Sequence, residues 1–479
     1  RGNLPLDSRF TSYCTSVSAM GESLPFARYA AEYVGTFILM FTVGCNVLTQ
    51  SGTHAGISIG CVLMVMIYSL GKSSGGNFNP AVSVALGLCG KLPWSEVAIY
   101  SAMQLVAGIS AALCYVAMLG KSFKLEPTPG HTWLAAGLCE MLYTFMLCFV
   151  VLNTAASKVH AGKNQFYGLA IGFVIIAGAY SGGSMSMGCF NPAVAFGIDV
   201  SSVASAVKYS FLYAAFELLG ACMAAGFFVL CRPEELALER APSPPTLYSK
   251  LASEFIGTYM LTLTVGLNVL NGSSAGAFSV AASLTCMIFA LGSVSGAHFN
   301  PAVTTAIFCA GHTDLAPLDA AAYMLVQILA GIAAALSYVS IMGGKAFVLF
   351  PDEYSLAQAC VGELVFTFVL AFVVLSVATV RTPLSEYFGL AIGMCVTAGG
   401  VAIGAVSGAS LNPAVSIGVY TSAAVVGIGA FWHCIIYSMV EIFAGVVAAS
   451  VFHATQPSEA KVSPFNMLGD LVGYGAVRP

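Results

Sequence analysis

The tetrapeptide Asn-Pro-Ala-Val occurs four times in this chain, beginning at Asn79, Asn191, Asn300 and Asn412. Successive copies are 112, 109 and 112 residues apart, so the interval is almost constant. A four-residue string found once carries little information, but four copies in register indicate a gene that was duplicated twice. The sequence therefore predicts four equivalent places where the backbone adopts the same special conformation.

The composition indicates a membrane protein with many spans. Charged residues make up 8% of the chain and hydrophobic residues 58%, whereas soluble domains usually carry ~25% charged residues. Runs such as 97–118 and 423–440 contain almost no charge, and ~20 apolar residues suffice to cross a bilayer. The fifteen cysteines are odd in number and lie mostly inside apolar runs, which is typical of small buried side chains rather than disulfides. A net charge of −4 is too small to indicate nucleic acid.

Twelve apolar spans are predicted, and an even number places both termini on one side of the membrane. If that side is the cytosol, thirteen of the seventeen Lys and Arg residues lie inside, as the positive-inside rule requires. The charged, proline-containing segment 232–250 is predicted to be a cytosolic linker. The spans are 27–49, 55–72, 94–119, 131–153, 166–183, 205–231, 249–271, 276–293, 316–341, 354–377, 386–403 and 424–452.

The two halves of the chain match each other, and each half also repeats internally. Polar residues inside the apolar spans recur at offsets of 222 to 224, namely Glu32 with Glu254, Gln104 with Gln327, Glu140 with Glu363 and Glu217 with Glu441. Within a half, each block of three spans contains one Asn-Pro-Ala motif. Because three is odd, the second block must be inverted in the membrane, as in channels and transporters whose site lies at the midplane.

The Asn-Pro-Ala motif is suited to start a helix in mid-membrane. Asn is a good N-cap, and Pro fits the first helical position because no N–H is needed there. The Gly- and Ser-rich approach to each motif is non-helical, which is tolerated at this depth only when it is buried or lines a water-filled cavity. Two inverted half-helices would meet with their positive ends together, repelling cations, while the Asn amides donate hydrogen bonds. This predicts a pore for small uncharged solutes.

The chain resembles the aquaporin, or major intrinsic protein, family twice over, across residues 25–452. The resemblance rests on the paired motifs, a Glu opening the first and fourth spans, a Gln in the third, and the Leu-Ala-Ile-Gly string at 169–172 and 390–393. It implies an all-α membrane protein with a tandem aquaporin fold, in which twelve transmembrane helices and four re-entrant half-helices form inverted repeats. It also implies a passive channel rather than an enzyme, no cofactor, and a homodimer of chains that mimics the family's tetramer.

The expected organisation is a cytosolic segment at 1–24, one unit at 25–231, the linker at 232–248, a second unit at 249–452 and a cytosolic tail at 453–479. The pore motifs are Asn79, Pro80, Ala81, Asn191, Pro192, Ala193, Asn300, Pro301, Ala302, Asn412, Pro413 and Ala414. The family's selectivity filter maps onto Ile59, Ala179, Gly188 and Val194 in the first unit, and onto Val280, Gly400, Ala409 and Val415 in the second.

The filter departs from the family pattern, because Val194 and Val415 stand where most members have Arg. Both filters are therefore expected to be small, apolar and uncharged, and to admit urea, ammonia and hydrogen peroxide as well as water. The string 408–416 resembles the tonoplast type of aquaporin. Ala195 and Ser416 follow the valines, where the glycerol type usually has Asp, which weakens the case for glycerol.

The resemblance implies a scaffold role for six polar residues, with the Glu carboxylates accepting hydrogen bonds from the backbone of the irregular loops. These residues are Glu32, Gln104, Glu140, Glu254, Gln327 and Glu363. A proton relay is the alternative for the carboxylates. Glu217 and Glu441, in the sixth spans, match no firm family position and are given no role.

The two units also differ from each other. Asn77 in the first unit stands at the position that His298 occupies in the second. Met185, Met187 and Phe190 make one loop of the first unit bulkier than its counterpart. This is either drift at loop positions or a first pore that is narrower or gated. Cys189, two residues before Asn191, could confer sensitivity to mercurials.

Two other functions stay open. A structural or adhesive membrane protein with closed pores would also tolerate the loss of the filter Arg. A secondary transporter would need coupling-ion ligands at the midplane, where the motifs supply amides instead. The sequence does not distinguish the plasma membrane from the vacuolar membrane.

Overall fold

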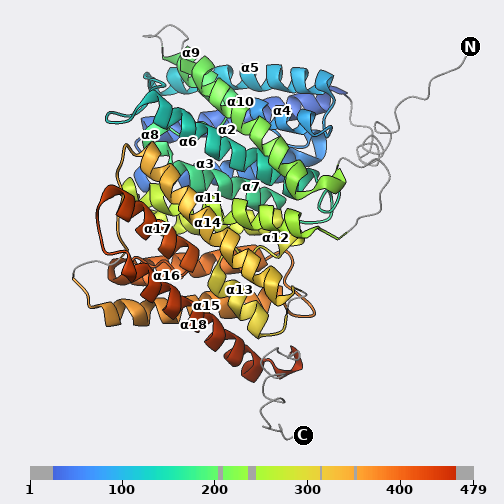
Figure 1. Ribbon diagram of the computed structural model, residues 1–479. Helices are drawn as coiled ribbons and strands as arrows, with labels where there is room; N and C mark the ends of the chain where they lie inside the picture. Colours follow the sequence, from blue (N-terminus) through green and yellow to red (C-terminus); the bar gives the residue numbers. More distant parts are fainter. Residues whose placement is uncertain (1–24, 203–208, 236–243, 313–314, 350–352, 460–479) are drawn as a thin grey trace, which may run out of the picture. The chain divides into compact units, whose positions relative to one another are not determined.

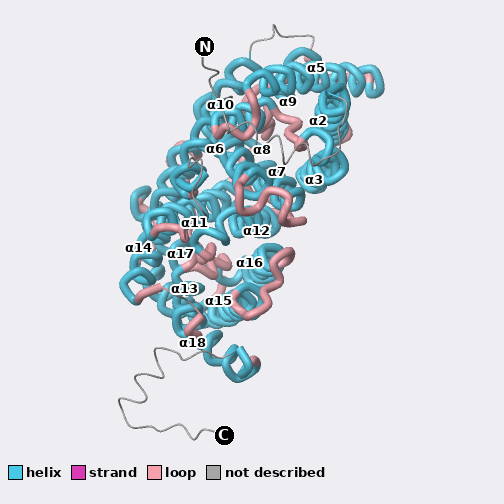
Figure 2. Tube along the Cα trace, turned by 90° about the vertical axis from the view of Figure 1, so that its right-hand side faces the viewer, coloured by secondary structure: helices cyan, strands magenta, loops and turns pink. Residues whose placement is uncertain are grey.

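The computed structural model describes residues 25–202, 209–235, 244–312, 315–349 and 353–459. Throughout these ranges every regular element is a helix, which confirms the predicted fold class; Figure 2 shows the helices in cyan and their connections in pink. The expected cytosolic segment at 1–24 and most of the expected tail lie outside the described residues. The chain forms two compact units, residues 1–244 and 245–479, and the division between them falls inside the segment expected to be the linker.

Unit 1, coloured blue to green in Figure 1, consists of two blocks of three longer helices, each with one short helix that follows an Asn-Pro-Ala motif. The first block contains α2 (Pro25–Leu48), α3 (Ala55–Ser74), α4 (Pro80–Leu88) and α5 (Trp94–Leu119). The second contains α6 (Trp133–Val151), α7 (Tyr167–Ser181), α8 (Gly183–Ser186), α9 (Pro192–Ser201) and α10 (Tyr209–Cys231), and α6 runs on into a π-helical turn at Leu152–Ala156.

Unit 2, coloured yellow-green to red, repeats this order. Its first block contains α11 (Leu247–Leu270), α12 (Gly276–Ser295), α13 (Pro301–Cys309) and α14 (Pro317–Ile341). Its second contains α15 (Leu356–Ala378), α16 (Phe388–Ser407), α17 (Pro413–Val426) and α18 (Trp432–Thr455).

The short helix of each block packs on the third helix of the other block. In unit 1, α9 packs on α5 and α4 packs on α10; in unit 2, α17 packs on α14 and α13 packs on α18. The backbones come so close that a Cβ on Gly108 would lie 2.3 Å from the Ala193 carbonyl oxygen, and one on Gly331 would lie 2.2 Å from that of Ala414. Small residues permit such close contacts between membrane helices. The crossed packing is the arrangement that an inverted repeat requires.

Ten helices in the described part of the chain are long and apolar enough to cross a membrane, whereas twelve spans were predicted. The two expected spans outside this set are α7 and α11. Helix α7 has 15 residues because the chain turns at Gly182 into the separate helix α8, whereas its counterpart α16 runs unbroken for 20 residues. Helix α11 has 24 residues and, like its counterpart α2, one basic and one acidic residue in its first half, but Tyr259 and Thr262 stand where α2 has Phe37 and Met40, so it is more polar than α2.

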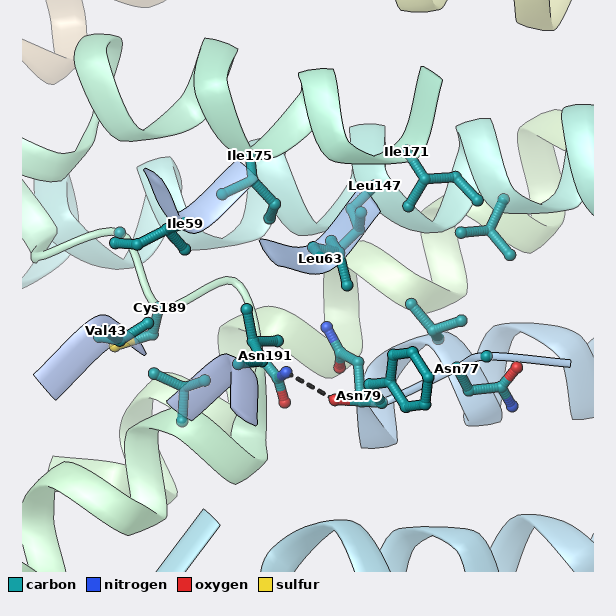
Figure 3. Close-up of a pocket in the computed structure, with 17 residues that line it drawn as sticks. Val43, Ile59, Leu63, Asn77, Asn79, Leu147, Ile171, Ile175, Cys189 and Asn191 are labelled. Atoms are coloured by element: carbon teal, nitrogen blue, oxygen red, sulfur yellow. Dashed lines mark hydrogen bonds between the residues drawn. The ribbon is translucent and has the colours of Figure 1, made fainter. Parts of the chain in front are cut away.

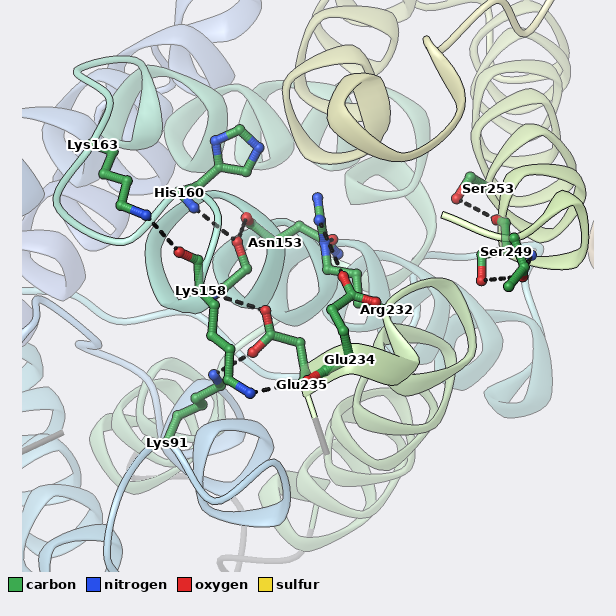
Figure 4. A network of polar contacts seen from close by, with 12 residues as sticks. Lys91, Asn153, Lys158, His160, Lys163, Arg232, Glu234, Glu235, Ser249 and Ser253 are labelled. Carbon is green, nitrogen blue, oxygen red and sulfur yellow. Dashed lines mark hydrogen bonds and ion pairs between the residues drawn. The ribbon is translucent and has the colours of Figure 1, made fainter. Parts of the chain in front are cut away.

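A polar network joins the residues after α10 to two loops of unit 1 (Figure 4). The Glu235 carboxylate accepts from Lys91 Nζ at 2.7 Å and from the backbone N–H of Lys158 at 2.7 Å. The buried Arg232 donates from Nε to Asn153 Oδ1 at 2.7 Å. These contacts fix the residues after α10 to the end of α4 and to the turn between α6 and α7.

Candidate functional site

Each Asn-Pro-Ala motif begins a short helix, as the sequence predicts. Pro80, Pro192, Pro301 and Pro413 are the first residues of α4, α9, α13 and α17. The preceding Asn is the N-cap in every case, and its Oδ1 accepts from the backbone N–H two residues on at 2.8–2.9 Å. Helix α17 continues for 14 residues, which is longer than the expected ten or so.

The two motifs of a unit are joined by reciprocal hydrogen bonds. Asn191 Nδ2 donates to the Phe78 carbonyl at 2.9 Å (Figure 3). Asn79 Nδ2 donates to the Phe190 carbonyl at 2.8 Å. In unit 2, Asn300 Nδ2 donates to the Leu411 carbonyl at 2.8 Å and Asn412 Nδ2 to the Phe299 carbonyl at 2.9 Å. A side-chain amide has two N–H donors, so one donor of each Asn orients the side chain and the second can serve a molecule in the cavity.

The residue before each Asn adopts a left-handed conformation although none is Gly. The φ angles are +52° at Phe78, +48° at Phe190, +51° at Phe299 and +53° at Leu411. Such a conformation costs on the order of 1–3 kcal/mol and persists only where the surroundings enforce it. The left-handed conformation turns the carbonyl of each residue toward the Asn of the other motif. A large apolar side chain does not favour this conformation, so the sequence did not predict it.

Buried glutamates hold these strained segments. Glu32 is fully buried and accepts from Ser74 Oγ at 2.6 Å, from the N–H of Asn77 at 3.0 Å and from the N–H of Phe78 at 2.7 Å. Gln104 Nε2 donates to the same carboxylate at 2.8 Å. Equivalent contacts to a Ser and two consecutive backbone N–H groups occur at Glu140, Glu254 and Glu363, and Gln327 donates to Glu254. These are the contacts expected of a scaffold.

A cavity lies beside the paired asparagines in each unit. Apolar side chains form most of each wall, among them Leu63, Leu147 and Ile171 in unit 1 (Figure 3). The asparagine amides and the non-helical backbone before them supply the polar part. The residues that line the cavity of unit 1 do not include Met185, Met187 or Phe190, all of which the structure describes.

Three of the four expected filter positions line the cavity of each unit. They are Ile59, Gly188 and Val194 in unit 1, and Val280, Ala409 and Val415 in unit 2. The fourth position, Ala179 or Gly400, lines neither cavity. A Cβ on Gly56 would lie 3.1 Å from the Ala179 Cβ, and a Cβ on Gly400 would lie 2.8 Å from that of Ala277, so these residues face the neighbouring helix α3 or α12.

The cavities differ in two polar positions. Asn77 and Cys189 in unit 1 correspond to His298 and Ser410 in unit 2, and all four are lining residues. Asn77 Nδ2 donates to Ser83 Oγ at 3.1 Å, and His298 Nδ1 lies 3.1 Å from Thr304 Oγ1. The two sites are therefore alike in architecture and unlike in local polarity.

Sequence reasoning missed what Glu217 and Glu441 contact. Glu217 Oε1 accepts from the backbone N–H of Asn191 at 2.8 Å, and Glu441 Oε1 accepts from that of Asn412 at 3.1 Å. Their recurrence in the sixth span of each unit was the available signal. The asparagine partners could not be inferred, because they lie 26 and 29 residues away in the sequence and meet the carboxyl groups only in the folded chain.

Comparison with known proteins finds one family in both halves of the chain. The family model described as Major intrinsic protein matches residues 21–228 and again residues 243–453. Similar proteins include Probable aquaporin NIP7-1 of Arabidopsis thaliana, 35% identical over 191 residues, and Putative aquaporin NIP4-1 of the same plant, 33% identical over 224 residues. These matches cover 36% and 44% of this chain, and the chain spans 66% and 75% of the length of those relatives.

Nodulin-26 of Glycine max is 34% identical over 186 residues, which is 36% of this chain and 68% of that protein. Similar solved structures include the aquaglyceroporin from Plasmodium falciparum, at 20% identity and a TM-score of 0.38, covering 44% of this chain and 96% of the other. The string 408–416 predicted a resemblance to the tonoplast type, but these similar proteins are named NIP. That finer prediction was therefore wrong. A valine at the filter position did not identify the subfamily. The chain belongs to the major intrinsic protein family and carries two copies of the family's domain.

Proposed function

We propose that the chain is a passive membrane channel for water and small uncharged solutes, with one pore in each unit. The observation that carries this proposal is the pair of asparagine amides held at facing half-helix N-termini beside an apolar cavity, as at Asn79 and Asn191. Each amide has a spare donor for a neutral oxygen or nitrogen atom. The positive ends of the half-helices oppose cations and protons.

The solutes follow from the walls of the cavity. Val194 and Val415 line the cavities and add no charge, so the walls offer a passing molecule few hydrogen bonds and no ionic contact. Urea, ammonia and hydrogen peroxide are the proposed solutes besides water, and glycerol is a weaker candidate. We further propose that both termini lie in the cytosol and that two chains form a homodimer with four pores.

Stopped-flow light scattering on proteoliposomes tests this function. The purified protein should give fast shrinkage in a sucrose gradient and rapid re-swelling in urea, both well above protein-free liposomes. Rates equal to those of empty liposomes for every solute would overturn the proposal and favour a structural membrane protein with closed pores.

A further inference from the structure

The second asparagine of each unit makes a backbone contact with a carboxyl group. The backbone N–H of Asn191 donates to Glu217 on α10, and that of Asn412 donates to Glu441 on α18. Both carboxyl groups are fully buried. In unit 2, Ser416 Oγ also donates to Glu441 Oε1 at 3.0 Å.

The matching position in the first block of each unit is occupied by Gln rather than Glu. Gln104 Nε2 donates to Glu32 at 2.8 Å and to Ser83 Oγ at 3.1 Å, so it supports the scaffold carboxylate instead of the asparagine. Gln327 makes the same two contacts, with Glu254 and Thr304. The carboxyl groups on α10 and α18 therefore have a different partner from their counterparts.

Stability alone does not explain these carboxyl groups. The second oxygen, Oε2, of Glu217 and of Glu441 is buried and has no hydrogen-bond partner among the described residues. A buried polar atom without a partner is costly. Glutamate thus stands at a position where its backbone contact is with the asparagine of the pore motif.

The contact completes the set of bonds that orients the asparagine. Asn191 Oδ1 accepts from the Ala193 N–H at 2.9 Å, Nδ2 donates to the Phe78 carbonyl, and the backbone N–H donates to Glu217. With all three fixed, the direction of the remaining Nδ2 hydrogen is also fixed. Asn412 is held in the same way by Ala414, Phe299 and Glu441.

We propose that Glu217 and Glu441 are positioning residues that set the direction in which the second asparagine of each pore donates its free hydrogen bond. This inference rests on the proposed channel function. A misdirected donor changes how well the pore replaces the hydrogen bonds of a solute, so it alters the ratio between solutes and the activation energy of transport. Poor folding lowers the number of pores and leaves both quantities unchanged once the permeability of protein-free liposomes is subtracted.

The test compares two double variants in proteoliposomes, Glu217→Leu with Glu441→Leu and Glu217→Gln with Glu441→Gln. The Gln side chain keeps a carbonyl oxygen for the asparagine N–H, so its urea-to-water permeability ratio should equal that of the wild type. The Leu variant removes the acceptor, and its ratio should change at least threefold, with a higher activation energy for water. Ser210→Ala with Ser438→Ala is the control, because each of these hydroxyls is buried on the same helix without a hydrogen-bond partner among the described residues.

An unchanged ratio and activation energy in the Leu variant would overturn the proposal, as would a changed ratio in the Gln variant. The single variants Glu217→Leu and Glu441→Leu carry the same test if the double variant does not reconstitute. A wild-type protein without transport would instead refute the channel function itself.

Discussion

The side-chain nitrogen of Asn191 lies 2.9 Å from the carbonyl oxygen of Phe78, although 113 residues separate them in the chain. The bond ties the start of one half-helix to the turn that precedes the other. Its reciprocal, from Asn79 to Phe190, closes the pair. Because both half-helices depend on these two bonds, the geometry of the site is set by the loops as much as by the motifs.

The first prediction concerns the filter. Val194→Arg with Val415→Arg adds bulk and charge to both cavities, so urea permeability should fall at least fivefold while water permeability falls less. Stopped-flow rates for both solutes measure the ratio. Val194→Leu with Val415→Leu adds bulk without charge and separates the two effects. An unchanged urea-to-water ratio in the Arg variant would show that these positions do not control selection.

The second prediction concerns Cys189, which lines the cavity of unit 1 where Ser410 lines that of unit 2. A mercurial bound to this thiol should block one of the two pores and lower water permeability by roughly half. Cys189→Ser should remove the block, with reducing agent restoring the wild-type rate. Undiminished inhibition in Cys189→Ser would place the reactive thiol elsewhere.

The third prediction concerns pH. Burial, and then the positive charges of Arg232 and Lys163, lower the pKa of His160 to about 4. The unfolded chain therefore takes up a proton at higher pH than the folded one, so stability is lost as pH falls from about 6.5 toward 4. Between pH 7.5 and pH 5 the unfolding temperature of the wild type in detergent should fall more than that of His160→Gln. Equal falls in unfolding temperature for the two proteins would show that His160 does not contribute to the loss of stability at low pH.

The fourth prediction concerns helix packing. Gly108→Ala places a methyl group against the Ala193 carbonyl and should cost about 1–3 kcal/mol of stability, as overpacking does. Gly226, on α10, has open space around it, so Gly226→Ala should be neutral or stabilising by up to ~1 kcal/mol. Unfolding in a denaturing detergent compares the two. A loss in Gly226→Ala as large as in Gly108→Ala would remove the packing explanation.

Local rules predicted the parts of the site that depend on neighbouring residues. Asn-Pro specifies an N-cap and a first helical residue, and all four half-helices begin where these residues stand. The partners of the scaffold carboxylates came from the resemblance to a family. The left-handed Phe78 and the contact between Glu217 and Asn191 could not be predicted, because both depend on how distant segments meet. The end of α7 at Ser181 was predicted to within two residues, whereas the short helix α8 that follows it was not expected.

The most direct test of a pore in each unit replaces the asparagines in pairs. An Asp carboxylate cannot donate to the Phe78 or Phe190 carbonyl, so Asn79→Asp with Asn191→Asp should disable the first pore and remove about half of the water permeability. Asn300→Asp with Asn412→Asp should remove the other half, and the fourfold variant should match empty liposomes. Complete loss of transport from the second pair alone would contradict a conducting pore in unit 1, and undiminished transport in the fourfold variant would contradict both.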